Sequence, residues 1–214
     1  APLSNYIKAL QTVTYKNSDD INPVIGLRTI EWLVNDGETN SIAVNSQIDV
    51  GGRNDSPTSV DEAEEVDAGS SISAATKSNL LANDADPEGD TLTIQSFRLG
   101  KEQQSNVEFL AGSTLTGTYG KITIEANGSY IYTADQIASK RLLIDQTRTE
   151  TFTYTISDSQ AVDTGEIEIT IRGINDKPIA NNDAFQIEEN SSKFRSSVIG
   201  LLSNDTDIDG DPLY

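Results

Sequence analysis

The chain has 214 residues, and its 34 acidic against 15 basic side chains give a net charge of −19. Such an excess of negative charge disfavours nucleic acids and anionic membrane surfaces as partners. Cysteine, histidine and methionine are absent, which excludes a disulfide framework, a thiolate nucleophile, a zinc site with nitrogen and sulfur ligands and a Ser-His-Asp triad. An acidic chain with 36% hydrophobic residues fits a soluble, extracellular or cation-loaded protein.

Alternating apolar and polar residues predict β-strands along most of the chain. The first such run is RTIEWLVNDGE, residues 28–38. The stretch KITIEANGSYIYT, residues 121–133, alternates on both sides of Asn127 and Gly128, a pair that favours a tight hairpin turn. The stretch ADQIASKRLL, residues 134–143, favours a helical turn.

Two further runs, TFTYTIS at 151–157 and GEIEITIRG at 165–173, place their large apolar side chains on one face. Short strands separated by turn signals are typical of a β-sandwich. We therefore expect an all-β fold, a Greek-key β-sandwich, repeated in tandem.

The sequence contains an internal repeat. Residues 54–92 align without a gap with residues 175–213, at an offset of 121 residues from Asn54 to Asn175. The shared positions include both linkers and both acidic loops, namely Asp55/Asp176, Pro57/Pro178, Leu80/Leu201, Leu81/Leu202, Asn83/Asn204, Asp84/Asp205, Asp86/Asp207, Gly89/Gly210, Asp90/Asp211 and Leu92/Leu213. A second match, of residues 28–38 with 150–160, precedes each linker. The chain therefore contains the last part of the repeating unit twice and its first part twice.

This repeat predicts three parts in the chain. The C-terminal part of a preceding β-sandwich repeat occupies residues 1–52, one complete repeat occupies 53–173, and the N-terminal part of a following repeat occupies 174–214. Both linkers are short and contain proline, which favours stiff joints between the repeats.

Two loops, DADPEGD at 84–90 and DTDIDGD at 205–211, share the pattern D-x-D-x-[DE]-G-D. Oxygen ligands at alternate positions, with glycine for a sharp turn, suit a hard cation that takes six to eight oxygens. The loop resembles the first half of an EF-hand, but its twelfth position is Gln95 and a predicted strand follows, which argues against an EF-hand. A solvated acidic turn is the plain alternative. Further acidic residues lie at the linkers and, as Asp36 and Asp158, in the hairpin loops before them.

The linkers of the form ND-x-P, the stretch IEEN at 187–190 and the stretch LLANDADPEGDTLTI at 80–94 resemble the cadherin-like tandem repeats, of the bacterial Ig-like or VCBS type, of giant bacterial RTX adhesins. The resemblance implies that Ca²⁺ binds at the joints between successive domains. It also implies that the ligands come from the linker Asn and Asp, from a first-strand Glu of the preceding domain and from a D-x-D loop of the following domain.

Carried onto this sequence, the resemblance implies one ligand set at each linker. The sets are Asn54, Asp55, Asp84 and Asp86 at the first linker, and Asn175, Asp176, Asp205 and Asp207 at the second. Asp67 is the expected first-strand ligand, and it aligns with Glu188 of the following repeat. The family usually has Glu at this position, where this repeat has Asp. Glu64 and Glu65, which lie nearby in the sequence, are therefore the alternative ligands.

Several features of the expected site stay open. Asp36 or Asp158 is expected to replace an acidic motif that the family carries between late strands and that this sequence lacks. A separate site inside each loop is the alternative, formed by Asp90 with Glu88 or by Asp211 with Asp209. The number of ions at each joint is not fixed by the sequence.

Two other classes of function fit the sequence less well. A glycosidase needs two carboxylates, but here the acidic residues recur in repeated loops, so we expect no enzymatic activity. A carbohydrate- or ice-binding module needs an exposed aromatic or threonine platform, and the sparse aromatic residues, 6% of the chain, alternate as core residues do. TLTGTYG, residues 114–120, is the loop to test for a ligand. Asn127 also fits a glycosylation acceptor, although a hairpin turn explains it.

The function expected from the sequence is a non-catalytic, calcium-rigidified extender segment of a large, secreted, cell-surface bacterial adhesin that projects a distal ligand-binding region. Its partners would be the neighbouring repeats. Residues 1–52 of one chain are also expected to pair head to tail with 176–214 of another. No apolar run approaches membrane-spanning length, so neither membrane insertion nor nucleic-acid binding is expected.

Overall fold

The computed structural model describes residues 14, 16, 26–104, 107–184, 189–190 and 200–214. The chain divides into two units, residues 1–55 and 56–214. Among the described residues, no helix has the length and apolar character needed to cross a membrane.

The first unit contains one β-hairpin. Strand β1, Gly26–Trp32, pairs antiparallel with β2, Val44–Val50, in a register that sets Trp32 opposite Val44. Ile30 and Trp32 lie on the less exposed face of β1, and the indole nitrogen of Trp32 donates to Ser46 Oγ at 2.9 Å. The alternation expected for residues 28–38 is present up to Trp32, where the strand ends; Trp32 is only partly buried, and Leu33 and Val34 are both exposed.

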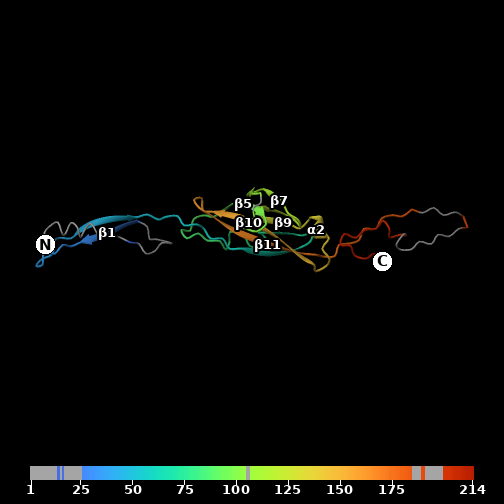
Figure 1. Cartoon of the computed structure of the whole chain (residues 1–214), viewed down its shortest axis with the longest axis horizontal. Helices are drawn as coiled ribbons and strands as arrows, with labels where there is room; N and C mark the ends of the chain where they lie inside the picture. The colour runs from blue at the N-terminus through green and yellow to red at the C-terminus, as the bar shows by residue number, and fades with distance from the viewer. Residues whose placement is uncertain (1–13, 15, 17–25, 105–106, 185–188, 191–199) are drawn as a thin grey trace. The chain divides into compact units, whose positions relative to one another are not determined.

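The second unit contains two sheets (Figure 1). One sheet has the strand order β3-β11-β10-β5-β6 and the other β4-β9-β8-β7. The bounds are β3 Glu62–Asp67, β4 Ser71–Ser73, β5 Thr93–Leu99, β6 Phe109–Leu110, β7 Thr114–Thr116, β8 Lys121–Ile124, β9 Tyr130–Thr133, β10 Thr147–Ser157 and β11 Val162–Arg172. A short helix, α2, spans Ile137–Lys140, within the stretch expected to form a helical turn. The expected β-sandwich fold is confirmed.

The core lies between the two sheets and consists of the residues whose alternation predicted it. Ile122, Ile124 and Tyr132 from one sheet and Phe152, Tyr154, Ile156, Ile167, Ile169 and Ile171 from the other are all 0% exposed. The rings of Tyr132 and Phe152 meet edge to face across the core, 6.0 Å apart. The hairpin turn expected at Asn127-Gly128 is present, with Ile124 opposite Tyr130.

The first strand of the sandwich pairs with its last strand. β3 runs parallel to β11, from Glu62 opposite Ile167 to Asp67 opposite Arg172. The chain then turns at Gly69, whose φ is +75°, a conformation that glycine adopts without steric cost. It enters the other sheet as β4. The segment before β3 and the segment after β11 therefore leave from opposite ends of this strand pair.

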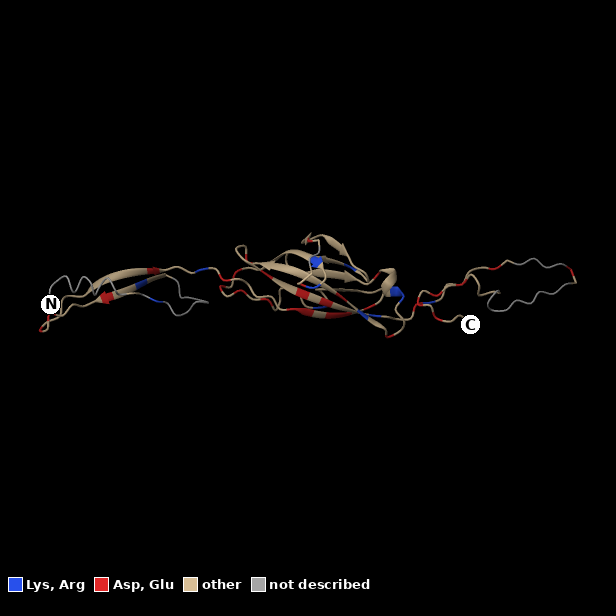
Figure 2. Ribbon diagram, in the orientation of Figure 1, with Lys and Arg blue, Asp and Glu red and all other residues tan. Residues whose placement is uncertain are grey.

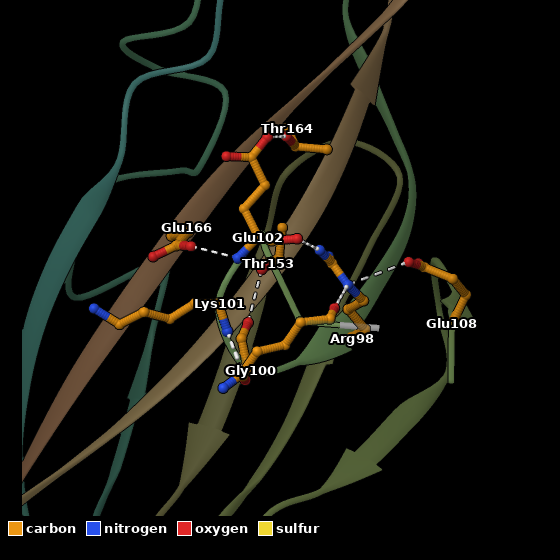
Figure 3. Close-up of polar contacts among 9 residues, drawn as sticks. Arg98, Gly100, Lys101, Glu102, Glu108, Thr153, Thr164 and Glu166 are labelled. Carbon is orange, nitrogen blue, oxygen red and sulfur yellow. Dashed lines mark hydrogen bonds and ion pairs between the residues drawn. The ribbon is translucent and has the colours of Figure 1, made fainter. Parts of the chain in front are cut away.

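The segment after β5 folds back over the outer face of the five-stranded sheet (Figure 3). Arg98, only 8% exposed, donates to the carbonyl oxygens of Glu102 and Gln104 at 2.6 and 3.2 Å. The backbone amide of Glu102 donates to Glu166 on β11 at 2.6 Å. Thr153 Oγ1 on β10 donates to the carbonyl oxygen of Gly100 at 2.7 Å. These bonds fix residues 100–104 against β10 and β11.

Candidate metal centre

The two acidic loops are built alike at the level of the backbone. Thr58 and Ala85 form an isolated antiparallel bridge, with N–O distances of 2.8 and 3.0 Å. Ile179 and Thr206 form the same bridge 121 residues later, at 2.7 and 3.0 Å. Each bridge ties the segment after a linker to the acidic loop that follows it. The sequence repeat is therefore also a structural repeat.

The first aspartate of each loop accepts a backbone amide. Val60 donates to Asp84 Oδ1 at 2.8 Å, and Asn181 donates to Asp205 Oδ1 at 2.7 Å. The other oxygen of Asp84 is buried and has no hydrogen-bond partner. Burial raises the pKa of Asp84 above its usual value, the amide of Val60 opposes this rise, and the nearby Asp163 carboxylate adds to it.

The second aspartate of each loop organises the turn. Asp86 Oδ1 accepts the amides of Glu88 and Asp90, both at 3.0 Å. Asp207 Oδ1 accepts the amides of Asp209 and Asp211 at 3.0 and 3.2 Å. The glycines of the two loops have φ of +78° and +82°, which explains why glycine follows the third acidic residue. Asp86 Oδ2 is also buried without a partner.

In the second loop the carboxylates converge. One oxygen each of Asp207, Asp209 and Asp211 lies within 4.8 Å of the others. Asp209 is 8% exposed; its Oδ2 accepts the backbone amide of Asp176 at 2.8 Å, and its Oδ1 is buried without a partner. Figure 2 shows Asp and Glu recurring along the segment that follows β11.

Glu62 belongs to the same end of the second unit as Asp84 and was not expected from the sequence. Its Oε2 accepts the hydroxyl of Tyr154 at 2.7 Å, while its Oε1 is buried without a partner. Burial raises the pKa of Glu62 to about 7; the hydrogen bond from Tyr154 opposes this rise, and the Asp84 charge adds to it. The sequence did not identify Glu62 as a site residue, because the alternation of its strand marks it only as a core-facing position.

Asp163 is a second acidic residue that the sequence reasoning missed. It lies on β11, and its Oδ2 accepts the backbone amide of Ser59 at 2.8 Å across 104 residues of sequence. Together with Asp84 and Glu62 it surrounds the segment 58–62 with negative charge. No motif identifies it, because the contact depends on how the loops at this end of the sandwich meet.

Asp36 and Asp158 fold their own loops. Asp36 Oδ1 accepts the amides of Glu38 and Thr39 at 3.0 and 2.9 Å, and Asp158 Oδ1 accepts those of Gln160 and Ala161 at 2.7 and 2.6 Å. The amides of Thr39 and Glu38 hold the pKa of Asp36 below its usual value. Asp158 is 5% exposed. In each loop one carboxylate oxygen is thus occupied by a local turn.

The linker residues repeat as well. Asn54 Nδ2 donates to the carbonyl oxygen of Asp55 at 2.9 Å, and Asn175 Nδ2 donates to that of Asp176 at 2.8 Å. Asn54 and Asp55 end the first unit, whereas Asp84 and Asp86 belong to the second. The grouping of these four residues therefore stays a prediction.

Asp67, the expected first-strand ligand, is paired with an arginine. Its Oδ1 accepts Nε and Nη2 of Arg172 at 3.0 and 2.8 Å, because the two residues lie opposite each other on β3 and β11. Of its two possible substitutes, Glu64 pairs with Lys77 at 3.0 Å. Glu188, which aligns with Asp67, lies outside the described residues.

The donor set suits a hard divalent cation. Three carboxylate oxygens of the two loops, Asp84 Oδ2, Asp86 Oδ2 and Asp209 Oδ1, are buried without a hydrogen-bond partner. The ion pairs of the described residues, which also include Lys121 with Asp135 and Arg98 with Glu108, do not involve these oxygens. Buried carboxylates without a countercharge are costly, and calcium takes ligands of this kind.

Comparison with known proteins gives the family. Residues 54–173 match the model of the bacterial cadherin-like domain. The chain belongs to this family. The resemblance read from the linkers and acidic loops is therefore confirmed at the level of the cadherin-like domain. No curated protein matches the sequence.

Solved structures also resemble this cadherin-like chain. An endo-fucoidan hydrolase of glycoside hydrolase family 107, MfFcnA4, is 14% identical with a TM-score of 0.37, and the match covers 73% of this chain and 21% of the hydrolase. Domains EC1–3 of mouse clustered protocadherin PcdhgC3 are 14% identical with a TM-score of 0.34, covering 75% and 47%. A Bacteroides thetaiotaomicron protein is 13% identical with a TM-score of 0.28, covering 58% and 93%.

Proposed function

We propose that this cadherin-like chain is a calcium-rigidified extender segment of a large secreted bacterial adhesin, and that it has no catalytic role. The observation that carries the proposal is the repetition of one acidic arrangement after each linker, with carboxylate oxygens buried and unpartnered in both copies. A solvated turn has no need to bury such oxygens. A cation bound among them offsets the cost of their burial.

Calcium acts in this proposal by connecting neighbouring repeats. Without the ion, the aspartates of a loop and its linker repel one another. With the ion, ligands from the linker and from the following loop share one centre, and the joint stiffens. The loop ligands are Asp84 and Asp86 after the first linker and Asp205, Asp207 and Asp209 after the second. The linker ligands are the Asn-Asp pairs at 54–55 and 175–176. A row of such joints holds a distal binding domain away from the cell surface.

The same binding stabilises each repeat. An ion that binds the folded chain and not the unfolded chain adds about 2.7 kcal/mol per site when its free concentration is one hundred times the dissociation constant. Extracellular calcium modules bind at about 10⁻⁴ to 10⁻³ M. The chain would therefore gain its stability after export, where calcium is plentiful.

The test is calorimetric melting of the 214-residue chain in excess EDTA, in millimolar calcium and in millimolar magnesium. We expect a rise in melting temperature of many degrees that is specific to calcium and is reduced in Asp84→Ala and Asp205→Ala. An equal melting temperature in EDTA and calcium would reject the proposal and leave the loops as solvated turns.

A second candidate function is binding of a carbohydrate or another surface. The outer face of the four-stranded sheet carries neighbouring hydroxyls: Ser71 Oγ meets Thr133 Oγ1 at 2.9 Å, and Thr114 Oγ1 meets Thr123 Oγ1 at 2.7 Å. These two hydroxyl pairs are the groups through which such a ligand would bind. Glycan-array binding that is lost in Thr114→Val but independent of calcium would favour this function.

Self-association is part of the proposal. Ile30 and Trp32 align with the core residues Phe152 and Tyr154, yet both are only partly buried. We propose that residues 176–214 of another chain cover this face of β1, giving head-to-tail chains. Sedimentation velocity at high protein and calcium concentration is the test, and a purely monomeric sample would reject it.

A further inference from the structure

The two acidic loops differ at one position. Glu88 and Asp209 occupy the same place in the repeat, immediately before the loop glycine. Glu88 is exposed, whereas Asp209 is 8% exposed. Glutamate is longer than aspartate by one methylene group, and at this position only the shorter side chain lies inside its loop.

The two carboxylate oxygens of Asp209 have different surroundings. Its Oδ2 accepts the backbone amide of Asp176 in the linker at 2.8 Å. Its Oδ1 is buried and has no hydrogen-bond partner. Because a carboxylate of Asp209 lies within 4.8 Å of those of Asp207 and Asp211, this side chain connects the acidic cluster to the linker backbone.

We propose that Asp209 makes the second loop, residues 205–211, the tighter of the two calcium sites and couples its occupancy to the linker at Asp176. The inference rests on the proposed calcium binding and adds an order of loading to it. Among the described residues, the set of three carboxylates within 4.8 Å is found in this loop. Calcium affinity rises with the number of charged ligands and the rigidity of the site.

The coupling follows from the geometry of one carboxylate. A cation that takes Asp209 Oδ1 fixes the plane of the carboxylate, and that plane also orients Oδ2 toward the amide of Asp176. Filling the site therefore immobilises the linker backbone through a single side chain. Glu88 is exposed, so the first loop does not bury a carboxylate at this position. The second joint then stiffens at a lower calcium concentration than the first.

Isothermal titration of calcium into the whole 214-residue chain, stripped of metal, tests the affinity. The wild type should show two classes of site. Asp209→Asn should weaken the tighter class about tenfold or more, while Glu88→Gln, at the matching but exposed position of the first loop, should change both classes little. Glu168→Gln, which removes the same charge from an exposed position of β11, is the control and should match the wild type. An Asp209→Asn titration equal to that of Glu168→Gln would overturn the inference.

Two-dimensional ¹⁵N NMR of the Asp176 amide tests the coupling and also reports whether each variant is folded. Asparagine retains an oxygen that accepts the Asp176 amide but lacks the charge, so Asp209→Asn should keep the metal-free signal and lose its shift on adding calcium. Asp209→Ala should change the signal even without metal. A calcium shift that persists in Asp209→Asn would overturn the coupling. A wild type that binds no calcium would instead reject the proposed function, which keeps the two failures distinct.

Discussion

The backbone amide of Val60 donates a hydrogen bond to Asp84 Oδ1 at 2.8 Å, across 24 residues of sequence. This bond holds the segment after the first linker against the acidic loop and leaves the other oxygen of Asp84 buried without a partner. Asn181 and Asp205 repeat the relationship at 2.7 Å. The backbone thus fixes the position of this side chain without any ion, so the proposed calcium would bind with little rearrangement of the loop.

Replacing Asp84 by asparagine should have opposite effects with and without calcium. The amide oxygen of asparagine still accepts from Val60, but the buried charge is gone, so the melting temperature in EDTA should stay equal or rise. In saturating calcium the variant should lose up to about 2.7 kcal/mol of stabilisation at one hundred times the dissociation constant. Calorimetry in both buffers measures this, with Glu168→Gln as the control. A similar loss of stability in both buffers would contradict the prediction.

The metal-free protein should lose stability as the pH rises through the range in which Glu62 ionises. The pKa of Glu62 is raised to about 7 in the folded state by burial, against a usual value near 4.5. A raised folded-state pKa favours the folded protein below pH 4.5, and this contribution is lost progressively up to about pH 7. Glu62→Gln should remove that dependence.

Urea unfolding in EDTA at pH 5 and pH 8 checks this pH effect. The glutamine variant should gain stability relative to the wild type at pH 8 and little at pH 5. Lysine or arginine does not pair with Glu62 among the described ion pairs, so no lost pair opposes the gain. Equal differences at the two pH values would refute the assignment to Glu62.

Glu150 should be a stability residue. It is 5% exposed, and it accepts the hydroxyl of Tyr132 at 2.9 Å and the backbone amide of Thr118 at 2.5 Å. Glu150→Ala leaves the buried hydroxyl of Tyr132 without an acceptor and also removes the acceptor of the Thr118 amide, which should cost about 2–4 kcal/mol in urea unfolding. The exposed Glu125→Ala should change stability by less than about 0.5 kcal/mol. A cost for Glu150→Ala as small as that of the control would be inconsistent with this role.

Arg172 should compete with calcium for Asp67. The guanidinium contacts Asp67 Oδ1 at 2.8 and 3.0 Å, and both side chains are about half exposed. Exposed pairs of this kind contribute about 0–1 kcal/mol, so Arg172→Gln should change the metal-free stability little. If Asp67 is a ligand, the variant should bind calcium several-fold more tightly, and Asp67→Asn less tightly, in calorimetric titration. Unchanged affinity in both variants would remove Asp67 from the ligand set.

Much of the fold was predictable because its signals are local. The alternation in β10 and β11 set Phe152, Tyr154 and Ile169 in the core, and the Asn127-Gly128 turn fixed the β8–β9 hairpin. The acidic loops were predictable as well, because their acidic residues, glycine and spacing all fall within seven residues. The internal repeat added the expectation that both loops fold alike, which the matching bridges support.

The rest depends on contacts between segments far apart in the sequence. The Arg172–Asp67 pair arises from the parallel register of β3 and β11, which no local pattern encodes. Glu62 and Asp163 reach the first loop through the packing of the sandwich end. The different exposure of Glu88 and Asp209 could not be predicted from the sequence either, since Glu and Asp both fit the same loop pattern.

The pairing of β3 with β11 has a mechanical consequence. Because these strands run parallel and the chain enters at Glu62 and leaves at Arg172, tension applied along the chain pulls them past each other lengthwise. The backbone hydrogen bonds of the six paired positions then carry the load together, in shear, and do not open one at a time. A single molecule pulled by the two ends of this domain would therefore be loaded in its most resistant direction.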